Sequence, residues 1–207
     1  MAKKRISDVL IEVLANAGIE RIYGITGDSL NSVNDSLRRN GKIAFEHVRH
    51  EETAAFAAGA EASLTGKLTV CAGSSGPGNL HLINGLFDCH RNRVPVLAIA
   101  SHIPQSEVGL NYFQETHPEN LFKECSCFCE LISNPKQMPE ILFRAMNAAV
   151  GNQDVAVIVL PGDVAVMETE IDELPVWHHP RLPHIVPQRE DIEEMSAHLE
   201  KGERITL

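Results

Sequence analysis

Val155-Ala-Val-Ile-Val-Leu160 is a continuous apolar run in which no polar residue alternates with the apolar ones. Such a run is typical of a strand that is buried on both faces, as in a parallel sheet covered by helices. The residues just before it, 139–150, have the spacing of a helix that would pack onto the sheet. This pair of segments therefore predicts an α/β fold.

The same alternation extends outward along the chain. Besides 155–160, we expect strands at 21–25, 42–48, 67–72, 94–100 and 125–132. Helices are expected at 6–17, 28–39, 51–64, 79–90 and 139–150. Six strands that alternate with helices predict a doubly wound, mostly parallel sheet with helices on both faces.

The domain organisation follows from a change in composition. Residues 1–167 are predicted to form one domain, and 168–189 an extended linker, because it holds Pro175, Pro180, Pro183 and Pro187. Asp191 to Leu199 resembles an amphipathic helix and 204–207 the start of a strand. We therefore expect 190–207 to begin a further domain and the chain to be a fragment.

Composition excludes some classes of protein. A formal net charge of -10 and a pI near 5.4 provide no basic surface for nucleic acid. No apolar run approaches the ~20 residues of a membrane span, and the first residues, MAKKRISDVL, lack the apolar core of a signal peptide. We expect a cytoplasmic protein.

Cysteines and histidines give little support for a metal site. If Cys125-Ser-Cys127-Phe-Cys129 were a strand, its three thiols would share one face, but zinc ligands are usually spaced more widely, so buried reduced thiols are the simpler interpretation. His178, His179 and His184 lack a regular ligand spacing. We predict no metal ligand in this chain.

Glu51 is the first candidate site residue. It opens an Ala-rich helix and shares a face with Ala55 and Ala58, whose small side chains allow close approach to the carboxylate. Glu52 instead shares a face with Phe56. A carboxylate at a helix N-terminus also has a structural explanation, because it complements the helix dipole.

Two glycine loops follow predicted strands. Val70-Cys-Ala-Gly-Ser-Ser-Gly-Pro-Gly-Asn-Leu-His81 could present backbone N–H groups to phosphate, but it lacks the pattern of a P-loop or a dinucleotide fingerprint. Taken alone, this segment is better explained as a tight strand-to-helix turn. Gly24-Ile-Thr-Gly-Asp-Ser29 is the second loop. Both loops and Glu51 should lie at the carboxyl edge of the sheet, where ligands of open α/β sheets bind.

A third connection, Gly109-Leu-Asn-Tyr-Phe-Gln-Glu-Thr-His-Pro118, is long for a loop between a strand and a helix. Long connections in compact domains are often functional. The aromatic pair Tyr112-Phe113 could equally fill a core or an interface.

Taken together and in this order, these segments resemble the pyrimidine-binding domain of thiamine-diphosphate-dependent enzymes. The stretches RIYGITGDSLN, RHEE, CAGSSGPGNLHLINGLFDCHRN, YFQETHPE and VIVLPGDVA are most similar to the pyruvate oxidases, which include quinone-dependent pyruvate dehydrogenases. The resemblance covers nearly the whole chain.

The resemblance implies a role for each candidate residue. Glu51 would share a proton with the N1′ nitrogen of the aminopyrimidine, which is general acid-base chemistry that activates the cofactor. Gln114 would lie beside the substrate, and Phe113 would stand between thiamine and flavin. The other implied cofactor-binding residues are Gly27, Asp28, Gly76, Pro77, Gly78 and Asn79.

The resemblance also implies an activity and partners. Pyruvate would be oxidatively decarboxylated to acetate and CO2, with electrons passed through FAD to a quinone. Mg²⁺ and the diphosphate would be held by a domain outside this chain, in a homodimer or homotetramer with active sites between subunits. Membrane contact would be peripheral, through a segment not present here.

Two other functions stay open. Acetolactate synthases also carry a Phe-Gln-Glu segment and a Ser-Gly-Pro-Gly turn, so an acetolactate-synthase-like carboligase is one alternative. The other is a non-catalytic module for oligomerisation. The simple 2-oxoacid decarboxylases fit less well, because they have paired histidines where this chain has Phe113-Gln114.

Overall fold

Strand β7 (Val155–Pro161) is the buried strand that its apolar run predicts, and it lies inside the sheet. In the computed structural model, which describes residues 2–171, 173–174, 176–181, 183 and 185–204, its side chains alternate between two cores. Val155, Val157 and Val159 pack in one core. Ala156, Ile158 and Leu160 pack in the other. The absence of polar alternation in the sequence is explained by burial on both faces.

The sheet has the order β3-β2-β4-β5-β7-β6, and every neighbouring pair is parallel. Its other strands are β2 (Arg21–Gly24), β3 (Ala44–His47), β4 (Thr69–Gly73), β5 (Val96–His102) and β6 (Phe128–Leu131). The six-stranded, doubly wound α/β sheet is confirmed, and it is parallel throughout.

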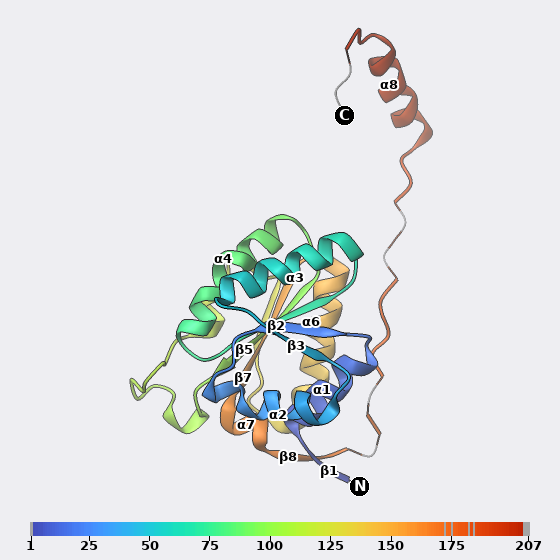
Figure 1. Cartoon of the computed structure of the whole chain (residues 1–207). Helices are drawn as coiled ribbons and strands as arrows, with labels where there is room; N and C mark the ends of the chain where they lie inside the picture. The colour runs from blue at the N-terminus through green and yellow to red at the C-terminus, as the bar shows by residue number, and fades with distance from the viewer. Residues whose placement is uncertain (1, 172, 175, 182, 184, 205–207) are drawn as a thin grey trace.

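Helices cover both faces of this sheet (Figure 1). One core is formed with α1 (Ile6–Asn16), α2 (Asn31–Asn40), α6 (Met138–Asn152) and α7 (Gly162–Val166). The other is formed with α3 (Glu51–Thr65), α4 (Pro77–Arg91) and the short α5 (Pro118–Leu121). Short 3-10 turns lie at η1 (Asp28–Leu30), η2 (Gln105–Glu107) and η3 (Pro135–Gln137).

The strand expected at 125–132 begins only at Phe128. Cys125 N donates to Phe122 O, and Ser126 Oγ donates to the same carbonyl, so a turn continues the end of α5. As a result Cys125 is buried, Cys127 is exposed and Cys129 is half-buried. The expectation that these thiols share one strand face is wrong.

A second, two-stranded sheet was not predicted. Strand β1 (Ala2–Arg5) pairs antiparallel with β8 (Glu168–Ile171), and Ile6 N donates to Met167 O at 2.9 Å. The sequences AKKR and ETEI do not predict strands, because both are mostly polar and 162 residues, 6–167, lie between them. The first four residues of the predicted linker, 168–171, are therefore a strand; the domain boundary itself stays a prediction.

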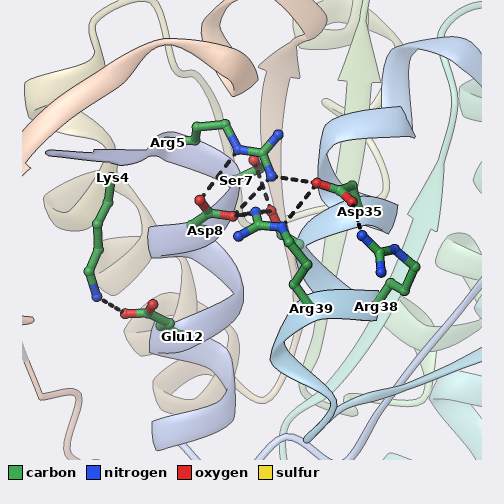
Figure 2. A network of polar contacts seen from close by, with 9 residues as sticks. Lys4, Arg5, Ser7, Asp8, Glu12, Asp35, Arg38 and Arg39 are labelled. Atoms are coloured by element: carbon green, nitrogen blue, oxygen red, sulfur yellow. Dashed lines mark hydrogen bonds and ion pairs between the residues drawn. The ribbon is translucent and has the colours of Figure 1, made fainter.

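A network of ion pairs joins the start of α1 to α2 (Figure 2). Asp8 accepts hydrogen bonds from Arg5, Ser36 and Arg39. Asp35 accepts from Arg5 at 2.7 Å, and also from Arg38 and Arg39. Asp8 lies in the first turn of α1, and Arg38 and Arg39 lie in the last turn of α2, where each charge also complements the helix dipole.

Beyond β8 the described chain runs extended along the domain (Figure 1). Trp177 is only 7% exposed, and its indole N–H donates to Asn147 Oδ1 at 2.9 Å. It borders a cavity of about 330 Å³ next to Gly18 and Lys67, where strands β2 and β4 begin. Helix α8 (Arg189–Glu200) follows with no buried residue; of the strand expected at 204–207, residues 205–207 lie outside the described residues.

None of the helices in the described ranges combines the length and the apolar composition needed to cross a membrane.

Candidate functional site

The site is built at the carboxyl edge of four adjacent strands, β3, β2, β4 and β5. Each of these strands ends where a candidate segment begins. The loop from Gly24 follows β2, Glu51 follows β3, and the Gly-rich turn follows β4. Because all strands run in one direction, the three segments converge at one edge, as the sequence predicts.

Glu51 is the first residue of α3 and is 8% exposed. His50 caps this helix, since its Nδ1 accepts the Glu52 backbone N–H at 3.2 Å. Ala55 and Ala58 on the same face as Glu51 are fully buried. Helix α4 packs closely against this small-residue face, since a Cβ at Gly85 would stand 2.6 Å from Ala55 Cβ.

The Gly-rich turn leaves no room for larger side chains. Gly76 has φ 68°, which favours glycine, and a Cβ there would stand 2.8 Å from Gln114 Cβ. A Cβ at Gly78 would stand 2.9 Å from Ser74 Oγ and 3.3 Å from Glu51 Oε1. Pro77 opens α4 in the position that suits proline, since no N–H is needed there.

Asn79 is fully buried beneath this turn. Its Nδ2 donates to Ser101 O at 2.7 Å, whereas its Oδ1 has no hydrogen-bond partner within the described chain. A buried acceptor without a donor lowers the stability of the fold. Such an atom is therefore expected mainly where a bound ligand can supply the donor.

The loop after β2 is fastened to the Gly-rich turn. Ser29 Oγ accepts the Ser75 backbone N–H at 2.9 Å, and Ser29 O accepts from Ser101 Oγ at 2.6 Å. A Cβ at Gly27 would stand 2.5 Å from Ser74 Cβ, so only glycine fits. Asp28 begins η1 and is exposed.

The long loop after β5 delivers Gln114 to the same place. Gln114 has φ 63° and accepts a hydrogen bond from Ser75 Oγ at 3.2 Å. Glu115 accepts the backbone N–H groups of Gly109 and Tyr112; the Gly109 hydrogen bond is the main cause that lowers the pKa of Glu115. Phe113, next to Gln114, is 78% exposed.

The structure thus brings Gly27, Glu51, the 76–79 turn and Gln114 together. Phe113 and Asp28 lie on the same loops but point their side chains into solvent. The roles that the resemblance implies for these residues stay predictions.

Sequence reasoning missed the histidines that surround Glu51. His81 Nδ1 lies 3.1 Å from Glu51 Oε2, and the His50 and His81 rings stack with centroids 4.3 Å apart. Among the described residues, His50, Glu51 and His81 form a group whose potential metal-ligating atoms all lie within 4.8 Å of one another. His50 directly precedes Glu51, but the sequence carries no local signal for His81, which lies 30 residues from Glu51.

The model of the family described as thiamine pyrophosphate enzyme, N-terminal TPP binding domain, matches residues 4–121. The chain belongs to this family. The residues matched include β2 to β5 and every candidate residue of the site, so the thiamine pyrophosphate enzyme fold that the resemblance implied is confirmed.

Relatives of this thiamine pyrophosphate enzyme domain differ in function. An uncharacterized 42.6 kDa protein in the isoamylase 3′ region of Pseudomonas amyloderamosa is 57% identical over all of this chain, which spans 52% of that protein. Pyruvate oxidase of Lactiplantibacillus plantarum is 38% identical over 75% of the chain, which covers 26% of the oxidase. Acetolactate synthase of Arthrospira platensis is 34% identical over 84%, which covers 31% of the synthase. The chain therefore spans about half or less of these relatives.

Proposed function

We propose that this chain is the pyrimidine-binding part of a thiamine-diphosphate-dependent pyruvate oxidase or quinone-dependent pyruvate dehydrogenase. The observation that carries the proposal is Glu51, a buried carboxylate whose Oε1 faces the side-chain-free Gly78 at a sheet edge built of loops. The similarity to a pyruvate oxidase at 38% identity supports the choice of reaction.

The residues present suit an aminopyrimidine. Such a ring needs a carboxylate partner for its ring nitrogen and a flat space beside it. Glu51 offers the carboxylate, and Gly76 and Gly78 keep side chains out of the turn. The buried Asn79 Oδ1 is an acceptor that has no donor among the described residues. The chemistry of the donor set therefore fits the thiamine pyrimidine.

When bound, thiamine diphosphate would supply a carbon acid, whose conjugate base can add to a 2-oxoacid, and a cationic ring that can accept the electron pair left when CO2 departs. Glu51 holds or releases a proton at the ring nitrogen, which is general acid-base work at a buried group. Gln114, fixed by Ser75 and Gly76, orients the substrate through its side-chain amide. Burial of Glu51 excludes water from the proton-sharing contact.

The remaining parts of the proposal lie outside these residues. We place the Mg²⁺, diphosphate and FAD sites in domains beyond this chain, since it spans only part of its relatives. A homo-oligomer with the site between subunits is supported by exposed apolar side chains beside it, including Leu80, Tyr112 and Phe113. A quinone as electron acceptor and peripheral membrane contact follow from the resemblance, and the cytoplasmic location follows from the composition of the chain.

The test is the visible spectrum of the complete gene product with thiamine diphosphate and Mg²⁺, before and after addition of pyruvate. Bleaching of a flavin band is expected, because two electrons would pass to FAD. Glu51→Gln keeps the shape of the side chain, but its amide cannot take up or release a proton. We therefore expect kcat to fall by about 10²–10⁴-fold, with an unchanged circular dichroism spectrum. Near-normal turnover of this variant would contradict the role of Glu51.

The second candidate function is an acetolactate-synthase-like carboligase, which the 34% identity to the Arthrospira platensis enzyme supports. It is distinguished in the same experiment. Consumption of pyruvate with formation of acetolactate, without reduction of a flavin, would replace the oxidase by the synthase. A gene product that consumes no pyruvate and binds no thiamine diphosphate would favour the non-catalytic module.

A further inference from the structure

The two oxygens of the Glu51 carboxylate have different surroundings. Oε2 lies 3.1 Å from His81 Nδ1, which is hydrogen-bond distance. Oε1 lies on the side of Gly78, where a Cβ would come within 3.3 Å of it. The carboxylate is therefore held at one oxygen and open at the other.

His81 is itself held in place from two sides. It projects from α4, and its ring stacks on that of His50 at 4.3 Å with an interplanar angle of 25°. His50 cannot turn freely, because its Nδ1 accepts the Glu52 backbone N–H as the cap of α3. The Glu51 side chain is 10% exposed, whereas that of His81 is 45% and that of His50 is 47% exposed. The two rings thus form the solvent-facing cover of the carboxylate.

We propose that His81 is a positioning residue for Glu51: its Nδ1–H donates to Oε2 and turns Oε1 toward the place where the ring nitrogen of an aminopyrimidine binds. His50 holds the His81 ring in the plane that this hydrogen bond needs. The inference rests on the proposed function, because it names which oxygen of Glu51 meets the cofactor.

A divalent cation is the other ligand that these three residues suggest, since their donor atoms lie within 4.8 Å of one another. The hydrogen bonds argue for positioning instead. Nδ1 of His50 already accepts an N–H and Nδ1 of His81 already contacts Glu51, so a cation that bound through either Nδ1 would have to break that contact. A metal ligand also needs an unprotonated nitrogen.

The first test uses the 207-residue chain without cofactor. Nitrogen-15 NMR of histidine side chains in alkaline buffer should show the proton of His81 on Nδ1, and Glu51→Ala should move it mainly to Nε2. His47, exposed at the end of β3, serves as the control and should not respond. A His81 Nδ1 without a proton overturns the inference. So does stoichiometric Zn²⁺ that shifts His50 and His81 together at micromolar concentration.

The second test uses the complete gene product and two probes, thiamine diphosphate and its analogue with CH in place of the ring nitrogen N1′. Calorimetry should show that His81→Ala binds thiamine diphosphate about tenfold more weakly, the loss of one hydrogen bond. The analogue should bind both proteins equally. His81→Asn should restore the affinity to within about threefold of the wild-type value, because its amide N–H can replace Nδ1–H. His47→Ala is the control.

The outcomes separate the two proposals. An equal loss of affinity for both probes in His81→Ala, or no rescue by His81→Asn, means that His81 is only structural and overturns this inference alone. A wild-type protein that binds both probes with equal affinity means that Glu51 does not meet the ring nitrogen. In that case the proposed function fails as well, even if the NMR result for His81 stands.

Discussion

At the scale of single residues, burial decides which thiols can react. Burial is the main cause that raises the pKa of Cys89 to about 12, of Cys125 to about 11 and of Cys129 to about 12. Burial also raises the pKa of the fully buried Cys71 well above its usual value. Because the thiolate is the reactive form, these four thiols are inert at neutral pH.

We therefore expect only Cys127, the exposed thiol, to react with a disulfide reagent in the native chain at pH 8. Its reaction should be slower than that of free cysteine, because burial of the sulfur also raises the pKa of Cys127. Counting released thiolate by absorbance should give one thiol in the folded chain and all five after denaturation. Cys127→Ser should remove the native reaction; two or more native thiols would contradict the burial of the others.

Glu51 could be predicted from sequence and His81 could not. The carboxylate follows a strand, opens a helix and has small residues at helical spacing, so local pattern is enough to single it out. Its partner His81 lies on another helix, and the distance between the two depends on how closely α3 and α4 cross. That crossing depends on Gly85 against Ala55, a contact between positions that no local pattern connects.

At the scale of elements, the network of Figure 2 predicts a pH-dependent stability. Hydrogen bonds from Arg5, Arg38 and Arg39 hold the pKa of Asp35 well below its usual range. Burial raises the pKa of Asp8, but the hydrogen bonds from Ser36 and the arginines outweigh it, so the net shift is downward. Carboxylates with a lower pKa in the folded state stabilise the fold above the unfolded pKa, about 4.

Asp8→Asn should lower the free energy of unfolding by about 1–3 kcal/mol at pH 7, because it removes a charged acceptor from a half-buried network. As the pH falls from about 4 toward the folded pKa, the wild-type loses this contribution by protonation. The difference between the two proteins, measured by urea denaturation, should therefore shrink near pH 3. The control Asp191→Asn, on exposed α8, should be neutral; a gap that stays constant with pH would contradict the network.

The sequence predicts elements best where burial on both faces leaves a strong pattern. Every residue of strands β4, β5 and β7 is buried, and the positions of these strands agree with expectation to within two residues. Strands β1 and β8 were missed, because their polar residues pair only with each other at the edge of the domain. Helix α7 is five residues long, too short to show a helical period.

At the scale of the whole molecule, the segment after residue 167 adds to the stability of the domain. β8 pairs with β1, and Trp177 buries its indole against α6 and the end of α1. Burial of one large aromatic side chain contributes about 2–3 kcal/mol.

A chain that ends at Met167 should therefore melt about 4–8 °C below a chain that ends at Arg181, as followed by far-ultraviolet circular dichroism. Trp177→Phe in the longer chain distinguishes the contribution of the indole from that of the β1–β8 pairing, and should account for part of the shift in melting temperature. Equal melting temperatures of the two chains would instead place the energetic boundary of the domain at 167, where composition alone places it.

Trp177 has one more consequence, since it is the only tryptophan of the chain. Its emission is a built-in optical reporter at the strand-starting edge of the sheet, opposite to the edge that carries Glu51. Release of the segment that leads to α8 would move the emission maximum to longer wavelength as the indole meets water. Ligands at the Glu51 edge can then be titrated while the fluorescence shows whether Trp177 stays buried at the opposite edge of the sheet.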